Sequence, residues 1–187
     1  MKKLFIAALM IASSVASFAQ HSVGSFSLQP KVGVSLATLV GDHAGDPSMK
    51  FGLVSGVEAE YQATDLIGVA AGLNYSMQGA NYDDPIGDSK LEYINIPVVA
   101  NFYVAKNFAL KLGVQPGFLV SAKSGKLDVK DHCKTFDFSI PVGASYEISN
   151  FVIDARYNFG LTAIPDGLLD KVRNSTIQLT VGYRFDL

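Results

Sequence analysis

Six segments of the chain alternate apolar with polar or small side chains. In Phe51–Tyr61, one set of alternate positions is Phe, Leu, Ser, Val, Ala and Tyr, and the other is Gly, Val, Gly, Glu and Glu. A repeat of two residues places successive side chains on opposite faces of an extended strand. The other five segments with this pattern are Ile67–Met77, Phe108–Val120, Phe136–Tyr146, Phe151–Phe159 and Ile177–Phe185. The pattern predicts strands that each have an apolar and a polar face.

Two further segments, Leu28–Ala37 and Leu91–Tyr103, alternate less regularly and complete a set of eight predicted strands. The connections between the strands are alternately long and short. The long connections are Val40–Lys50, Gln78–Lys90, Ser121–Lys134 and Gly160–Ser175, and the short ones are 62–65, 105–107 and 148–150. All long connections therefore leave from one end of the sheet. This order predicts an up-and-down meander, the arrangement found in outer-membrane barrels.

The N-terminal residues predict export. Lys2 and Lys3 precede the apolar run Leu4–Ile11, and Ser17-Phe18-Ala19 is a small-x-small cleavage site. We expect residues 1–19 to be a signal peptide and residues 20–187 to form one domain. The apolar run is shorter than the roughly 20 residues of a membrane-spanning helix. A single cysteine, far from the cleavage site, argues against a lipoprotein and excludes an intramolecular disulfide.

The composition favours strands that cross a membrane. The chain is 49% hydrophobic and 17% charged, with a mean hydropathy of +0.25, yet the expected mature chain has no apolar run long enough for a spanning helix. Aromatic residues at both ends of the apolar faces suit the two membrane interfaces. A soluble, lipocalin-like barrel would instead expose the opposite faces, which are rich in glycine and serine and poor in charge.

We therefore predict an all-β fold: a single closed, antiparallel, eight-stranded transmembrane β-barrel in the outer membrane. The even number of strands predicts that both termini lie in the periplasm. Pro97, Pro116 and Pro141 fall inside predicted strands. They argue against this fold, because each proline removes a hydrogen bond from a sheet without edges.

Two motifs carry a resemblance to a known family. They are the segment Ile153–Leu161, with the sequence IDARYNFGL, and the segment Val181–Phe185, with the sequence VGYRF. Together with the strand pattern and the signal peptide, they resemble the small outer-membrane β-barrel proteins of Bacteroidetes, the porin-like or PorT-like group. The chain departs from the usual barrel ending because Asp186 and Leu187 follow the terminal aromatic residue. The resemblance implies an outer-membrane barrel and no catalytic residues.

The polar faces predict a network of charges in the barrel interior. Its expected members are Glu58, Glu60, Lys111, Asp137, Glu147, Asp154, Arg156 and Arg184, with Tyr93, Asn95 and Asn101 beside them. Eight strands leave an interior just wide enough for side chains to fill. A guanidinium group does not lose its charge on burial, so we expect Arg156 or Arg184 to pair with a carboxylate across the interior. We favour a structural plug over the alternative, a path for protons or small ions.

No pattern in the sequence indicates a catalytic or cofactor site. A membrane hydrolase of the serine type needs a nucleophile, a histidine and a carboxylate together, but no histidine lies in a predicted strand. Two loop clusters contain metal-binding residue types without a recognised ligand spacing: Asp42, His43 and Asp46, and Asp131, His132 and Cys133. A third cluster, Asp83, Asp84 and Asp88, suits either a flexible acidic loop or a divalent cation that bridges lipopolysaccharide. We expect no enzyme activity and no cofactor.

The expected function follows from the fold. A net charge of −2 provides no basic excess for binding nucleic acid. We expect a non-enzymatic outer-membrane protein whose barrel is an anchor and whose four long loops face outward and bind ligands, surfaces or a protein partner. The other expected partners are outer-membrane lipid and lipopolysaccharide. Two alternatives stay open: a narrow channel for small solutes, and an accessory subunit of an outer-membrane secretion system.

Overall fold

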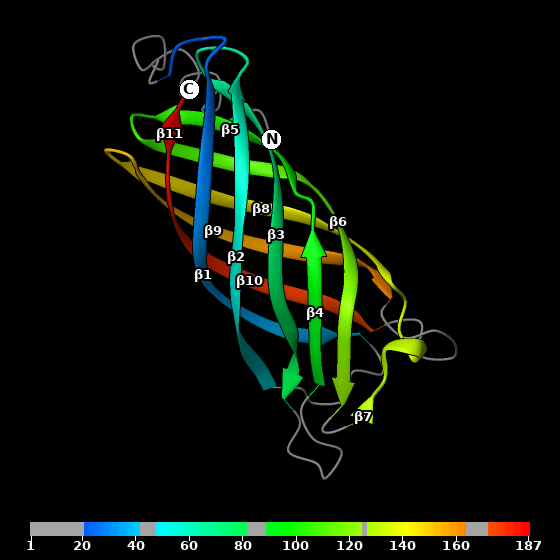
Figure 1. The fold of residues 1–187 in the computed structure, drawn as a ribbon. Coiled ribbons are helices and arrows are strands. Elements are labelled where there is room, and N and C mark those ends of the chain that lie inside the picture. Colours follow the sequence, from blue (N-terminus) through cyan, green and yellow to red (C-terminus); the bar gives the residue numbers. More distant parts are fainter. Residues whose placement is uncertain (1–20, 42–47, 82–88, 125–126, 164–171) are drawn as a thin grey trace, which may run out of the picture.

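The computed structural model describes residues 21–41, 48–81, 89–124, 127–163 and 172–187, and its strands form one sheet (Figure 1). The elements are β1 (Phe26–Val40), β2 (Ser48–Gln62), β3 (Ile67–Asn81), β4 (Ser89–Asn95), β5 (Val98–Ala105), β6 (Phe108–Ser124), β7 (Leu127–Asp128), the 3₁₀ helix η1 (Lys130–His132), β8 (Phe136–Ile148), β9 (Phe151–Ala163), β10 (Arg173–Tyr183) and β11 (Phe185–Asp186). Figure 1 shows β1 to β4 in front, crossing the more distant β8, β9 and β10 at an angle. Strands of a closed barrel are inclined in this way.

Pairing between the first and last long strands closes the sheet. β10 pairs antiparallel with β1, from Lys31 opposite Gly182 to Val40 opposite Arg173. β4 and β5 share one position between β3 and β6, and β11 extends β10 along β1. The wall therefore consists of eight strands in meander order. The predicted closed, antiparallel, eight-stranded barrel is confirmed.

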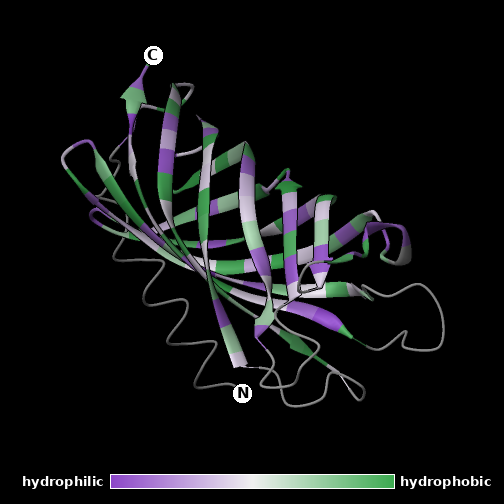
Figure 2. Cartoon of the chain, turned by 60° about the horizontal axis from the view of Figure 1, so that its bottom comes forward, coloured by the Kyte–Doolittle hydropathy of each residue, from purple (hydrophilic) through white to green (hydrophobic). Residues whose placement is uncertain are grey.

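The two faces of the wall differ in polarity. Large apolar side chains point outward: Phe51 is 63% exposed, Leu53 is 55% exposed and Leu112 is 51% exposed. Polar and charged side chains such as Asp154 point inward and are buried. Figure 2 shows the resulting alternation of hydrophobic and hydrophilic residues along the strands. An apolar exterior around a polar interior is the arrangement of a membrane barrel, and it excludes the lipocalin-like alternative.

The three prolines that argued against the barrel lie at interruptions of the ladder. Pro97 lies between β4 and β5, where its carbonyl oxygen accepts a hydrogen bond from Gly72 N. Pro116 lies opposite the same interruption and accepts a hydrogen bond from Ile96 N. Around Pro141, the pairs of β6 with β8 stop at Leu112–Val142 and resume at Gln115–Ser139. The wall thus closes around residues that cannot donate a ladder hydrogen bond.

The strands are longer than the alternation predicted. β1, β2 and β3 have 15 residues each and β6 has 17. The connections between the eight wall strands are 63–66, 106–107 and 149–150 at one end, and 41–47, 82–88, 125–135 and 164–172 at the other. Asn107 and Ser149 have positive φ angles of 62° and 56° in the two-residue turns. In the described part of the chain, no helix is long and apolar enough to cross a membrane.

Candidate functional site: the charged barrel interior

The structure buries all eight charged residues that the sequence places on the polar strand faces. Their exposed fractions run from 1% for Asp154 to 7% for Glu60 and Glu147. Seven of them belong to two clusters at different heights of the barrel. The eighth, Asp137, lies apart, and its Oδ1 makes no hydrogen bond with the described residues.

The central cluster is built on an ion pair between Arg156 of β9 and Glu58 of β2. Arg156 Nη1 donates to Glu58 Oε1 at 2.6 Å, and Nη2 donates to Oε2 at 2.7 Å. β10 and β1 separate these two strands in the wall. The pair therefore crosses the interior and joins strands that share no ladder. Two parallel hydrogen bonds between a guanidinium and a carboxylate fix both the distance and the orientation of the groups.

Three more residues complete the central cluster. Arg156 also donates to Asp154, from Nε at 2.7 Å and from Nη2 at 2.8 Å. Lys111 Nζ lies 2.5 Å from Asp154 Oδ2, and Lys31 donates to Glu58. Each carboxylate is thus held by an arginine and a lysine. Burying these charges is costly, and mutual pairing offsets that cost.

Glycines on the facing strands make room for the long charged side chains. Gly72 lies opposite Glu58 in the pairing of β2 with β3, and a Cβ atom at Gly72 would lie 2.5 Å from Glu58 Cγ. Gly143 lies opposite Arg156 in the pairing of β8 with β9, and a Cβ atom there would lie 3.0 Å from Arg156 Cα. These glycines are needed for space rather than for backbone freedom.

The second cluster surrounds Arg184, at the end of the barrel with the short turns. Arg184 Nη1 lies 3.5 Å from Glu60 Oε2 and 3.4 Å from Glu147 Oε1, and Arg184 Nε donates to Asp186 Oδ1 at 3.0 Å. Tyr103 Oη accepts from Arg184 Nη1 at 3.2 Å and donates to Glu60 Oε1 at 2.7 Å. These contacts link β2, β5, β8 and the C-terminal strands across the barrel end.

The first described residues lie over this same end. His21 Nε2 is 3.0 Å from Glu147 Oε2, and the His21 ring packs edge-on against Tyr103 with 5.4 Å between ring centroids. Gly24 N donates to Gln62 O at 2.8 Å, which attaches the segment to the end of β2. The chain just after the expected cleavage site therefore covers part of the barrel mouth.

The opposite half of the interior contains an apolar layer, which the sequence pattern did not predict. Its buried members are Leu39, Ala80, Leu91, Tyr93, Leu119, Ala122 and Val172. Val129 and Cys133, from the connection between β6 and β8, pack against it. Leu39, Leu91 and Leu119 lie on the inward strand faces near the long connections. Apolar residues at inward positions were the available signal for this layer.

The remaining candidate residues of the loops are only partly described. Asp42, His43 and Asp46, and Asp83, Asp84 and Asp88, lie outside the described residues. Cys133 is half-buried between η1 and β8, and burial raises the pKa of its thiol. A neutral thiol is a weak nucleophile and a weak metal ligand. Within the described ranges, no group of three or more His, Cys, Asp and Glu side chains is placed to hold a metal ion.

The chain matches the family model "Outer membrane protein beta-barrel domain" over residues 18–165, and it belongs to this family. Membership agrees with the apolar exterior and identifies the protein as an outer-membrane protein, as the sequence predicted. No match was found among curated protein sequences.

Several solved structures share the fold. Neisserial surface protein A is 20% identical, with a TM-score of 0.60, and the match covers 86% of this chain and 97% of that one. Ail, the attachment invasion locus protein of Yersinia pestis, is 21% identical, with a TM-score of 0.53 and coverages of 88% and 100%. OprG from Pseudomonas aeruginosa is 13% identical, with a TM-score of 0.52 and coverages of 90% and 99%. At these identities the likeness concerns the fold.

Proposed function

We propose that the protein is a non-enzymatic outer-membrane anchor with a closed interior, and that its four long connections bind partners at the cell surface. The observation that carries this proposal is the Arg156–Glu58 pair, which crosses the interior with hydrogen bonds of 2.6 and 2.7 Å. The apolar layer on one side of the pair and the Arg184 cluster on the other add two further obstacles to a solute. A rigid scaffold with long loops is a common design for binding proteins.

A narrow channel for small solutes is the alternative that this interior disfavours. A solute would have to separate buried ion pairs, and separating charges inside a barrel without replacing their hydrogen bonds is costly. Osmotic swelling of proteoliposomes in small sugars distinguishes the two functions. We expect the proteoliposomes to swell at the same rate as protein-free liposomes. Faster swelling that depends on sugar size would favour the channel.

We propose that the short-turn end faces the periplasm, together with both chain ends. His21 and Arg184 lie at that end of the barrel, and short periplasmic turns with longer outer loops are the rule for bacterial outer-membrane barrels. The long connections then lie outside the cell.

Labelling of intact cells with a membrane-impermeant maleimide tests this orientation. In a Cys133→Ser background, a cysteine introduced at Asp84 in a long connection should be labelled. A cysteine introduced at Lys106 in a short turn should be labelled only after the outer membrane is opened. The reverse pattern would contradict the proposed orientation.

The surface partners follow from this orientation. We propose contact with outer-membrane lipid and lipopolysaccharide around the barrel, and with a protein partner through the long connections. The IDARYNFGL and VGYRF motifs support membership of the PorT-like group of Bacteroidetes. With it they support the alternative of an accessory subunit in a secretion system. Crosslinking in intact cells, followed by purification of the tagged barrel, separates a stable subunit of a machine from an independent anchor.

A further inference from the structure

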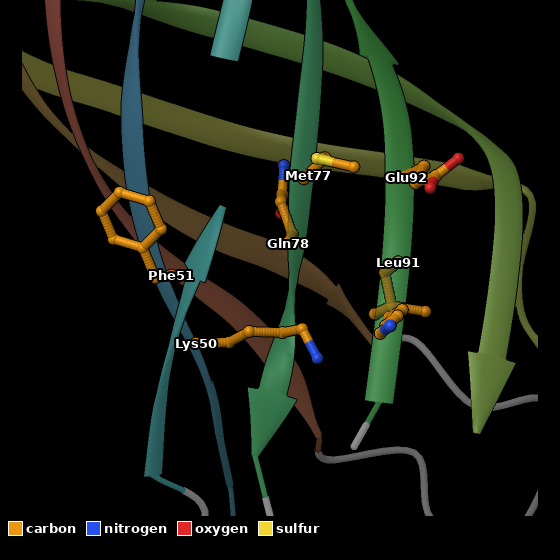
Figure 3. Close-up of a pocket in the computed structure, with 7 residues that line it drawn as sticks. Lys50, Phe51, Met77, Gln78, Leu91 and Glu92 are labelled. Atoms are coloured by element: carbon orange, nitrogen blue, oxygen red, sulfur yellow. The ribbon is translucent and has the colours of Figure 1, made fainter. Parts of the chain in front are cut away.

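The barrel wall contains a pocket near the end with the long connections. The pairing of β2 with β3 runs through Met49–Ala80, shifts register, and resumes at Val54–Ser76. A pocket of about 220 Å³ lies at this irregularity. Figure 3 shows side chains of β2, β3 and β4 around it. The lining residues are Lys50, Phe51, Met77, Gln78, Lys90, Leu91 and Glu92.

The lining combines three apolar side chains with two lysines, a glutamine and a glutamate. Phe51 is 63% exposed and Met77 is 37% exposed, and both lie on the outward, lipid-facing side of the wall. Figure 3 shows the Lys50 side chain extending from β2 toward β3, and Lys90 is exposed at the start of β4. A ligand that matches this lining has an anionic group attached to an apolar chain.

A second lysine lies beside Lys90. Lys90 and Lys123 are direct partners in the pairing of β4 with β6, and both are exposed. Residues directly opposite one another in an antiparallel pair share a face, and like charges in this arrangement are destabilising. An anion bound by both ammonium groups would remove that repulsion.

Among the described residues, two carboxylates lie near these lysines in the register. Glu92, two residues after Lys90, lies near the Tyr75 side chain on the same outward face. Asp128 lies opposite Lys123 in β7, and its Oδ1 accepts a hydrogen bond from Lys130 N at 3.0 Å. Lys90 lies between Gly79 and Lys123 in the register, so neither of its direct partners is a carboxylate. This position favours an external anion as a partner of Lys90, shared with Lys123.

We propose that Lys90 and Lys123 bind a phosphate group of the lipid A part of lipopolysaccharide, and that the adjoining pocket holds the beginning of one of its acyl chains. Ammonium groups bind phosphate through charge-assisted hydrogen bonds, and Phe51 and Met77 supply apolar contact. The assignment to the outer leaflet rests on the proposed orientation of the barrel, because the site lies at the end with the long connections.

Native mass spectrometry of the full mature protein in detergent tests the site. Bisphosphorylated lipid A is added to the wild type, to the double variant K90Q/K123Q and to the control K106Q, which removes an exposed lysine at the short-turn end. We expect the double variant to retain lipid A about tenfold more weakly for each ammonium–phosphate hydrogen bond that the substitutions remove. We expect K106Q and the wild type to be equal. Heat-dependent gel mobility verifies that each variant is folded.

Three competitors identify the ligand. Dephosphorylated lipid A should bind the wild type and the double variant equally weakly, and neither phosphatidylglycerol nor inorganic phosphate should displace lipid A at equal concentration. Equal retention by the wild type and the double variant would overturn the site. Displacement by phosphatidylglycerol or by phosphate would overturn its assignment to lipid A. Maleimide labelling separates these outcomes from a reversed barrel, in which binding would persist but the site would face the inner leaflet.

Discussion

Arg156 of β9 and Glu58 of β2, 98 residues apart in the chain, are joined by two parallel hydrogen bonds across the barrel interior. Neither strand pairs with the other, so this contact exists only in the closed barrel. The pair therefore reports on closure of the sheet and on closure of the interior at the same time.

The Arg156–Glu58 pair should show strong coupling in a double-mutant cycle. Replacing one partner leaves a buried charge with fewer hydrogen bonds, and we expect each single variant, E58Q or R156Q, to lose about 3 kcal/mol of unfolding free energy. Urea unfolding in lipid vesicles measures the cycle. We expect a coupling energy above about 1 kcal/mol, because the residues are in contact.

The matched control is the cycle of E58Q with K106Q. Lys106 is exposed in a short turn, so the two effects should add to within about 0.5 kcal/mol. If the effects of E58Q and R156Q on the unfolding free energy also add to within about 0.5 kcal/mol, the two residues do not interact.

Enlarging Gly72 should disturb the central cluster. A Cβ atom at this position would lie 2.5 Å from Glu58 Cγ, so we expect Gly72→Ala to cost about 1–3 kcal/mol through overpacking. Ala71→Val on the same strand is the control, because Ala71 faces outward and is exposed. Equal unfolding free energies for the two variants would contradict the role of Gly72 as a spacer.

A charge on the lipid-facing side should destabilise the barrel. Leu112 and Val142 are direct partners of β6 and β8, and they are 51% and 42% exposed. We expect Leu112→Arg or Val142→Arg to cost about 2–4 kcal/mol if the position lies near the bilayer midplane. Leu187→Arg, at the exposed chain end, is the control. Folding yields in vesicles that match the wild type for both wall variants would contradict a membrane location of this face.

Cys133 should react slowly with maleimide at neutral pH. Only the thiolate is nucleophilic, and burial raises the pKa of this thiol, so the reactive fraction at pH 7 is smaller than in a free cysteine. The rate should rise as the pH approaches the raised pKa. Stopped-flow labelling against a short cysteine peptide measures the difference, and equal rates at pH 7 would show that the thiol is not protected.

The sequence pattern sufficed for the wall of the barrel but not for its interior contacts. Alternation in Phe51–Tyr61 and its counterparts assigned the inward face correctly, because a strand has a fixed period of two. Arg156 pairs with Glu58 rather than with Asp137 because of the strand register and the closure of the barrel. The spacing of residues along the chain predicts neither of these.

The pattern missed several interior residues, and each omission has a physical reason. Lys31 follows Pro30 in a strand whose alternation is irregular, so the pattern did not place it among the interior charges. His21 enters the interior from outside the strands, and no periodicity describes such a segment. Leu91 and Leu119 lie on the inward faces of their strands, where they form part of an apolar layer. The pattern treated each inward face as polar along its whole length and therefore missed this layer.

Ion conductance across a planar bilayer tests the closed interior most directly. The purified wild-type protein, folded as judged by heat-dependent gel mobility, is added to a bilayer in symmetric salt, with a large porin as the positive control. We predict no conductance steps above the baseline at either polarity, because the Arg156 and Arg184 clusters and the apolar layer fill successive levels of the interior. Reproducible steps in the wild type, altered by E58Q or R156Q, would show an ion path through the charge network and contradict the closed anchor.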